Sequence, residues 1–256
     1  MNDVDSLPNS GCQACNGAQP LDFDFSMAFQ PIVDVTKREV FAHEALVRGL
    51  AGESAASVFA NVHDDNRYRF DQACRVKAIR LAASLGMRSL LSINFLPNAV
   101  YRPELCIRTT LAAAEHYGFP LQRIVFEITE GEKIEDHGHL RDIVQHYQQR
   151  GFLTAIDDFG AGYAGLNLLA EMQTDIIKLD MALIRNIHED PIRQAIVRGI
   201  VQVCHDLSAT VIAEGIETVA EYRLLRQMDI RLFQGYLFAR PAFEALPAIH
   251  WPDDSA

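Results

Sequence analysis

The chain has 256 residues, 49% of them hydrophobic, which is enough for one domain with a sizeable core or two small ones. Its net charge of -11 argues against binding polymeric nucleic acid or an anionic membrane through bulk charge, so an anionic ligand would need metal ions. With no apolar run near the roughly 18 residues of a membrane span and no basic or apolar signal-peptide region at its start, the chain is expected to be cytoplasmic.

Residues 1–22 are polar and rich in Pro, Gly and Asn, and they predict a poorly ordered tail ahead of one domain at 23–256. Cys12 and Cys15 form a C-x-x-C pair in this tail, but no second pair or histidine cluster completes a zinc site. A metal or redox role for the pair therefore stays open beside that of an unstructured tail. The other three cysteines fall in apolar patterns where buried thiols are common: Cys74, Cys106 and Cys204.

Along the domain, short apolar runs alternate with helical patterns, as is typical of strands and crossover helices around a parallel sheet. The apolar runs predict eight strands, at 25–33, 40–48, 89–95, 123–129, 152–158, 175–180, 209–215 and 230–236. The helical patterns lie near 71–86, 104–117, 138–149, 165–172, 191–207 and 218–228, with Asp190 and Pro191 as cap and first residue of the fifth. Eight strands with outer helices predict a barrel.

The connection between the first two strands is the stretch "DVTKRE", residues 34–39. A crossover between parallel strands needs a dozen or more residues. The first strand should therefore run antiparallel to the second.

Polar residues recur at or near the ends of the seven later strands: Glu44, Asn94, Glu127, Asp157 with Asp158, Lys178 with Asp180, Glu214 and Gln234. In a parallel barrel these ends meet at one face, where the catalytic residues of such enzymes sit. Crowded carboxylates repel one another unless they are protonated or bridged by cations, and oxygen ligands with an Asn carbonyl suit Mg²⁺ or Mn²⁺ better than Zn²⁺. A single such residue often only caps the next helix, but seven strands ending alike favour a metal site.

The stretch "AIDDFGAGYAGL", residues 155–166, places two carboxylates side by side after an apolar run. Neighbouring side chains on a strand point to opposite faces, so the pair serves one site only where the strand gives way to a loop. One carboxylate would then bridge two ions about 3.5–4 Å apart while its neighbour holds the second, which suits a phosphodiester substrate. His43 adjoins Glu44 but should face the other side of its strand, so it is expected to be structural.

An ordered series of motifs resembles the EAL domain family: "FQPIV", "EALVR", "LSINF", "FEITE", "AIDDFGAGYAGL", "IIKLD", "IAEGIE" and "QGYLFARP". The similarity runs from about Phe25 to Phe243. It implies a modified (β/α)8 TIM-like barrel with the first strand antiparallel, which agrees with the short first connection. It also implies hydrolysis of the bacterial second messenger cyclic di-GMP to linear pGpG with two divalent cations, Mg²⁺ or Mn²⁺.

The resemblance further implies roles for individual residues. One ion would be held by Glu44, Asn94, Glu127 and Asp157, and the second by Asp157, Asp158 and Glu214. Lys178 would position or deprotonate the attacking water, and Gln30, Leu46, Arg48 and Gln234 would contact substrate. Glu130, Asp180 and Glu217 would support the loop or the ligands from behind.

Several alternatives stay open. Two nearby dications should favour a neutral Lys178 that handles the proton of the water. Asp180 lies on the same strand face, so the alternative hypothesis is an ordinary ion pair between Lys178 and Asp180. The whole domain could be a cyclic di-GMP receptor that does not cut its ligand, or a different phosphodiesterase or phosphatase on the same barrel. A homodimer is open beside a monomer, and no regulatory partner is indicated.

Overall fold

The computed structural model describes residues 21–100, 102–129, 137–162 and 165–252. The strands are β1 (Ser26–Asp34), β2 (Glu39–Arg48), β3 (Leu90–Asn94), β4 (Ile124–Thr129), β5 (Leu153–Phe159), β6 (Ile176–Leu179), β7 (Thr210–Ala213), β8 (Leu232–Gln234) and β9 (Ala242–Phe243). The helices are α2 (Ala55–Phe59), α3 (Arg67–Ser84), α4 (Pro103–Cys106), α5 (Arg108–Tyr117), α6 (His137–Gln149), α7 (Gly165–Glu171), α8 (Met181–Ile184), α9 (Pro191–Asp206) and α10 (Val219–Gln227). The predicted tail, with Cys12 and Cys15, lies almost wholly outside the described residues.

The first eight strands close into a barrel in the order β2-β3-β4-β5-β6-β7-β8-β1, because β1 pairs with β2 as well as with β8. β1 is antiparallel to both of these neighbours, and the pairs from β2 to β8 are parallel. This confirms the modified (β/α)8 barrel with a reversed first strand. β9 adds two residues beside the start of β1, at Ala28 and Phe29.

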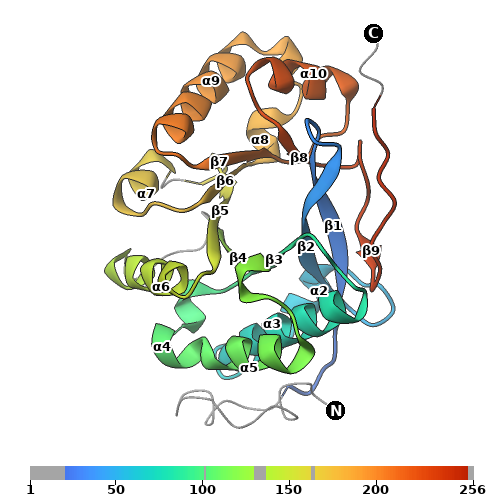
Figure 1. The fold of residues 1–256 in the computed structure, drawn as a ribbon, viewed down its shortest axis with the longest axis vertical. Coiled ribbons are helices and arrows are strands. Elements are labelled where there is room, and N and C mark those ends of the chain that lie inside the picture. The colour runs from blue at the N-terminus through green and yellow to red at the C-terminus, as the bar shows by residue number, and fades with distance from the viewer. Residues whose placement is uncertain (1–20, 101, 130–136, 163–164, 253–256) are drawn as a thin grey trace.

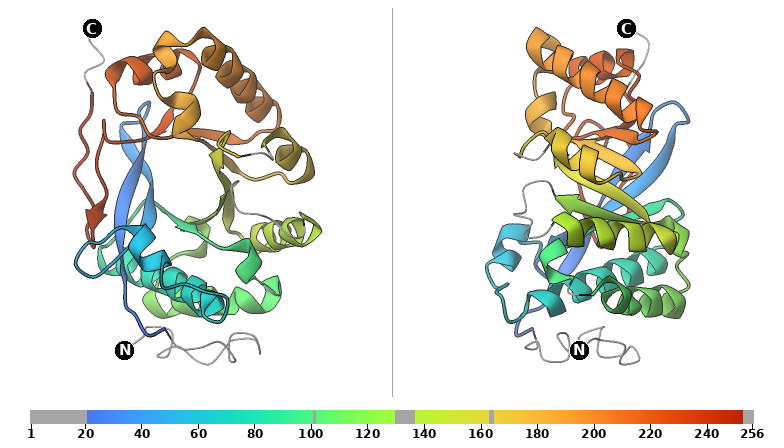
Figure 2. Two further views of the ribbon diagram at one scale, coloured as in Figure 1. Left: turned by 180° about the vertical axis from the view of Figure 1, so that it is seen from behind. Right: turned by 90° about the vertical axis from the view of Figure 1, so that its left-hand side faces the viewer.

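Helices surround the strands except on the side of β1, where β9 and the C-terminal segment lie instead (Figures 1 and 2). The reason is the short hairpin between β1 and β2, which leaves no room for a crossover helix. None of the helices in the described ranges is long and apolar enough to cross a bilayer.

The barrel interior has an apolar layer below a polar one. The lower layer is apolar and consists of Ile32, Ala42, Val125, Ala155, Ile176, Ile212 and Leu232. Because side chains on a strand return to the same face after two residues, the next inward position on each parallel strand lies one layer higher. These positions are polar: Glu44, Glu127, Asp157, Lys178, Glu214 and Gln234, with Gln30 placed two residues before Ile32 on the reversed strand. The two-residue spacing in the sequence thus places a polar layer directly above the apolar layer.

The six predicted helices are present, with the pattern near 104–117 interrupted at Ile107 into α4 and α5. Asp190 caps α9 as predicted, accepting from the backbone N–H of Ile192 at 2.9 Å and of Arg193 at 3.1 Å. The elements α2, α8 and β9 were not predicted, because two to five residues are too few to complete an apolar period. The three predicted core cysteines are buried.

His43 faces away from the polar layer, as predicted, and its Nδ1 lies 2.8 Å from the hydroxyl of Ser89. Burial lowers the pKa of His43 to about 4, so the folded state favours the neutral imidazole. The unfolded chain binds this proton near pH 6.5. The contribution of the neutral His43 to the free energy of unfolding is therefore full above pH 6.5, and it is lost as the pH falls towards 4.

We expect His43→Gln to reduce the acid sensitivity of folding. The difference in unfolding free energy between wild type and variant should change by about 2 kcal/mol between pH 7 and pH 4.5, measured by urea denaturation. His205→Gln, on the exposed side of α9, is the matched control. An equal pH response of wild type and His43→Gln would contradict the expectation.

Candidate active site

Lys178 lies at the centre of the polar layer. Its Nζ is 2.8 Å from Asp157 Oδ1 and 2.8 Å from Glu214 Oε1. It is also 3.0 Å from Glu127 Oε2 and 3.4 Å from Glu44 Oε2. Only 1% of the side chain is exposed. The strand ends therefore converge as predicted, and they do so around this one ammonium group.

The alternative pairing of Lys178 with Asp180 is not the arrangement found. Asp180 instead accepts from the backbone N–H of Ala182 at 2.7 Å and caps α8. Lys178 belongs to the carboxylate cluster.

Both adjacent aspartates face this cluster, but the predicted reason for it was wrong. The chain does not give way to a loop at the two aspartates, because β5 runs through both of them to Phe159. Ile156 pairs with Ile177 on β6, and Phe159 pairs with Leu179. Two residues of β5 therefore lie opposite a single residue of β6, and β5 bulges at the two aspartates. Asp158 takes a left-handed φ of +54° there. The bulge turns two consecutive carboxylates towards one site.

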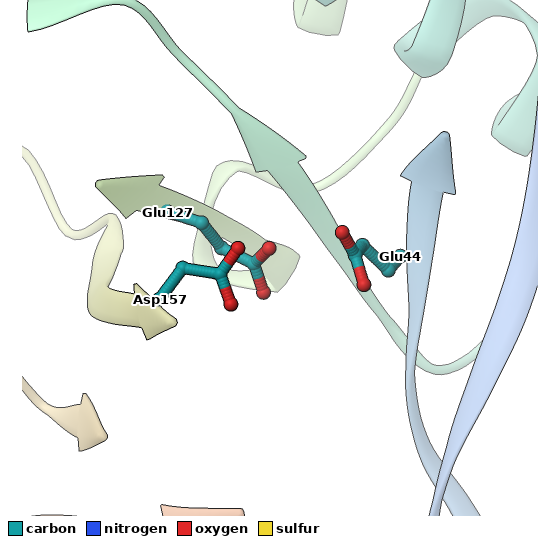
Figure 3. A group of neighbouring side chains, drawn as sticks. All are labelled: Glu44, Glu127 and Asp157. Carbon is teal, nitrogen blue, oxygen red and sulfur yellow. The ribbon is translucent and has the colours of Figure 1, made fainter. Parts of the chain in front are cut away.

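The carboxylates form two overlapping groups. Glu44, Glu127 and Asp157 place one oxygen each within 4.8 Å of one another, and so do Asp157, Asp158 and Glu214. Figure 3 shows the side chains of Glu127 and Asp157 side by side, with Glu44 pointing towards them from β2. Asp157 is the member common to both groups.

Asn94 and Ser92, both on β3, complete the first group. The amide nitrogen of Asn94 donates to Glu44 Oε1 at 2.9 Å, which leaves its carbonyl oxygen out of that bond. The buried hydroxyl of Ser92 donates to Glu127 Oε1 at 2.5 Å. Ser92 was not predicted as a site residue, although its place two residues before Asn94 on the same strand face is a usable signal.

The charges in the cluster are not balanced by Lys178. Burial raises the pKa of Glu127 to about 8 against the pull of the ammonium, and burial likewise raises the pKa of Asp157 and Glu214. Burial, with Asp157 as neighbour, raises the pKa of Asp158 to about 6. Without added positive charge, some of these groups hold protons at neutral pH, and a cation that binds them would release protons.

Two groups in the cluster favour their charged forms. Burial opposes the charge of Glu44, but Lys178 and hydrogen bonds from Gln234 and Asn94 outweigh it and lower the pKa. Burial also opposes the charge of Lys178, yet the surrounding carboxylates, Asp157 foremost, raise its pKa well above the ordinary value. The protein's own charges therefore favour the ammonium, and the neutral lysine stays a prediction for the protein with two dications bound.

A pocket of about 390 Å³ opens above the cluster. It is lined by Gln30, Glu44, Leu46, Asp157, Asp158, Lys178, Asp180, Met181, Glu214, Gly215, Glu217, Gln234, Gly235 and Tyr236. A second hollow of about 280 Å³ adjoins it at Leu46, Asp157 and Asp158 and is lined mainly by apolar side chains. The two hollows form one elongated cavity on both sides of the carboxylates, and Asn94 and Asp71 line its second part.

Of the predicted substrate contacts, Gln30, Leu46 and Gln234 line the larger pocket. Gln234 is 4% exposed and donates to Glu44 Oε2 at 2.7 Å, while its Oε1 has no hydrogen-bond partner among the described residues. Arg48, the fourth predicted substrate contact, is not among the residues that line these two pockets. Its guanidinium donates to the Val47 carbonyl at 2.7 Å. Of the predicted supporting residues, Glu130 lies outside the described residues.

The loop after β7 is held by two glutamates. Glu217, at the pocket rim, pairs with Arg185 through both carboxylate oxygens, at 2.9 and 2.5 Å. The buried Glu221 accepts from the backbone N–H of Asn186 at 2.9 Å and of Thr218 at 3.1 Å. Glu217 was predicted as a supporting residue and Glu221 was not. Both tie the segment that carries Glu214 to the end of α8.

The sequence model of the EAL domain family matches residues 19–241. The cyclic di-GMP phosphodiesterase PdeR of Escherichia coli K12 is 41% identical over 123 residues, which are 48% of this chain and 18% of that protein. The chain spans between about a fifth and just over half of the curated relatives that it matches first.

Two solved structures extend the comparison. A standalone versatile EAL protein from Vibrio cholerae O395, in its c-di-GMP-bound form, is 58% identical with a TM-score of 0.88, covering 90% of this chain and 98% of that chain. Klebsiella pneumoniae BlrP1, in a manganese/cy-diGMP complex at pH 6, is 38% identical with a TM-score of 0.83, covering 91% and 60%.

Proposed function

The chain belongs to the EAL domain family, and on this premise we propose that it is a metal-dependent phosphodiesterase that hydrolyses cyclic di-GMP to linear pGpG. The observation that carries the proposal is the pair of acidic groups that share Asp157, because two such groups suit two neighbouring cations with one bridging carboxylate. The ligand in the Vibrio cholerae structure and the activity named for PdeR support the choice of substrate and reaction.

The side chains present fit two divalent cations. We assign one to Glu44, Asn94, Glu127 and Asp157, and the other to Asp157, Asp158 and Glu214. The donors are carboxylate and amide oxygens, which favour Mg²⁺ or Mn²⁺. When bound, such cations lower the pKa of water towards neutrality and stabilise charge on the phosphate and on the leaving oxygen.

The protein's own residues bind and orient the other reactants. The unpaired Oε1 of Gln234 offers a buried acceptor to a ligand donor in the pocket. Lys178 as an ammonium donates hydrogen bonds from Nζ, which suits it to orient the attacking water; taking up the proton of that water requires cations that offset the four carboxylates. Arg48 reaches a phosphate only if its guanidinium leaves the Val47 carbonyl.

We expect purified protein to convert cyclic di-GMP to pGpG with Mg²⁺ or Mn²⁺ and to stop when EDTA is in excess, because the clustered carboxylates alone repel a phosphodiester. Nucleotide chromatography of the reaction with and without metal measures this. Undiminished turnover in EDTA would refute the metal dependence. Cyclic di-GMP that binds but persists with Mn²⁺ present would identify a receptor, and faster turnover of bis-p-nitrophenyl phosphate would point to another phosphodiesterase.

Ca²⁺ should bind the same carboxylates but support little turnover, because its longer bonds and looser geometry misplace the attacking water. The measurement is the pGpG formation rate with Ca²⁺ against that with Mg²⁺ at saturating concentrations. Equal rates would show that coordination geometry does not limit the reaction.

A further inference from the structure

A buried ion pair lies outside the barrel, behind the ends of β3 and β4. Asp71 and Arg75 are one turn apart on α3, with 2.5 Å between Asp71 Oδ2 and Arg75 Nη2. Their side chains are 4% and 1% exposed. Arg75 Nη1 also donates to the buried hydroxyl of Tyr147, from α6, at 3.1 Å.

Stability alone does not account for this pair. Taking two charges out of water costs free energy that their attraction often does not recover, and well-packed apolar side chains of similar size commonly stabilise a fold as well or better. The hydrogen bonds of Asp71 and Arg75 connect α3 to the segment after β3 and to α6.

Both charged groups contact residues one or two positions from proposed metal ligands. Asp71 Oδ1 accepts from the backbone N–H of Leu96 at 3.0 Å, just after β3 ends at Asn94. The Arg75 guanidinium lies 5.5 Å from the ring centre of Phe95, which adjoins Asn94. It also lies 5.2 Å from the ring centre of Phe126, which adjoins Glu127. Since side chains alternate along a strand, the rings face α3 while the two ligands face the barrel interior.

We propose that Asp71 and Arg75 are positioning residues for the metal centre, which fix the ends of β3 and β4 and through them Asn94 and Glu127. This inference rests on the proposed function, because it takes Asn94 and Glu127 as cation ligands. Asp71 uses one oxygen on the Leu96 N–H and the other on Arg75. Asn94 and Glu127 are paired in the β3–β4 register, so movement at Leu96 changes the spacing of both ligands.

The test measures Mn²⁺ binding to the full chain by isothermal titration calorimetry and by the Mn²⁺ EPR signal, with thermal unfolding alongside. The double variant Asp71→Leu/Arg75→Met removes both buried charges, which offsets part of the cost of leaving the Leu96 N–H and the Tyr147 hydroxyl without these partners, so its Tm should stay within about 10 °C of wild type. Its Mn²⁺ affinity should nonetheless fall by about 10–100-fold, the usual effect of losing groups that orient metal ligands.

Asp71→Asn keeps the shape of the side chain, and it tests the positioning role of Asp71 if the double variant does not fold. An amide has one acceptor oxygen, so in either orientation its NH2 group faces a donor, Leu96 N–H or Arg75. We expect Mn²⁺ affinity about 10-fold below wild type. The matched control is Lys77→Met, on the same helix as Asp71, which breaks the 2.7 Å ion pair between Lys77 and Asp24 ahead of β1 and should bind Mn²⁺ like wild type.

The outcomes separate this inference from the proposed function. A wild-type protein that takes up no Mn²⁺ would end the proposed function and this inference with it. Wild-type Mn²⁺ affinity in the folded Asp71 variants would overturn the positioning role and leave the proposed function intact. An equal loss in Lys77→Met would also overturn it, because the effect would then be a general loosening of α3.

Discussion

Replacing Lys178 with Met should lower kcat for cyclic di-GMP by about 10²–10⁴-fold, the range for loss of a group that orients or transfers a proton. Met has similar bulk but no charge, so the pocket keeps its shape while the water loses its donor. Mn²⁺ affinity should not fall, because the ammonium contacts the same four carboxylates that we assign to the cations. Single-turnover kinetics with separate measurements of Mn²⁺ and cyclic di-GMP binding test this.

The same variant should also be less stable when no metal is present. Four carboxylates would lose the cation that they share, and breaking a buried charge pair costs about 3–5 kcal/mol. Saturating Mn²⁺ should restore the unfolding free energy. Lys77→Met is the control, since it removes another largely buried lysine, whose ammonium contacts Asp24 and the Phe25 carbonyl and none of the four carboxylates. A folded Lys178→Met protein that binds cyclic di-GMP and turns over within about threefold of wild type would rule out the proposed role.

Asp157→Asn should damage the enzyme more than Asp158→Asn. Asp157 belongs to both acidic groups, whereas Asp158 belongs to one. We expect kcat to fall by about 10³-fold for Asp157→Asn and about 10²-fold for Asp158→Asn, consistent with the loss of preorganised charge at two ions or at one. Neither change strains the backbone, because Asn tolerates the left-handed conformation found at Asp158.

The number of bound ions gives a second readout for this pair. Calorimetry should show that Asp158→Asn still binds one Mn²⁺ at near wild-type affinity, through the group that contains Glu44 and Glu127. Asp157→Asn should weaken both binding events. The opposite order of effects would reverse the assignment of the bridging ligand.

The barrel and most of its polar layer could be predicted from the sequence because both depend on local spacing. The short link before Glu39 decides the direction of β1, and two-residue spacing places Glu127 and Lys178 above the apolar layer. These signals lie within one strand or in the link between two neighbouring strands, so they do not depend on how distant segments pack.

Features that depend on packing between distant segments were missed. A charged residue on a helix normally indicates its solvent side, so Asp71 and Arg75 gave no sign that α3 buries them. No glycine at Asp157 or Asp158 indicates a bulge in the sequence, and the bulge is seen only in the offset pairing between β5 and β6. The motif that contains Arg48 gives its place in the chain but not its side-chain conformation, which the Val47 carbonyl sets here.

The reversed first strand also determines where the chain enters the barrel. β1 begins at Ser26 opposite Arg48, the last residue of β2, so the incoming segment arrives at the edge where the parallel strands end. Lys77 holds this segment by donating to the carbonyl of Phe25 at 2.6 Å. Five extended residues, Leu21 to Phe25, span at most about 17 Å. A group carried at Leu21 would thus stay tethered beside the substrate pocket and could meet it at an effective concentration of the order of millimolar, without needing measurable affinity from solution.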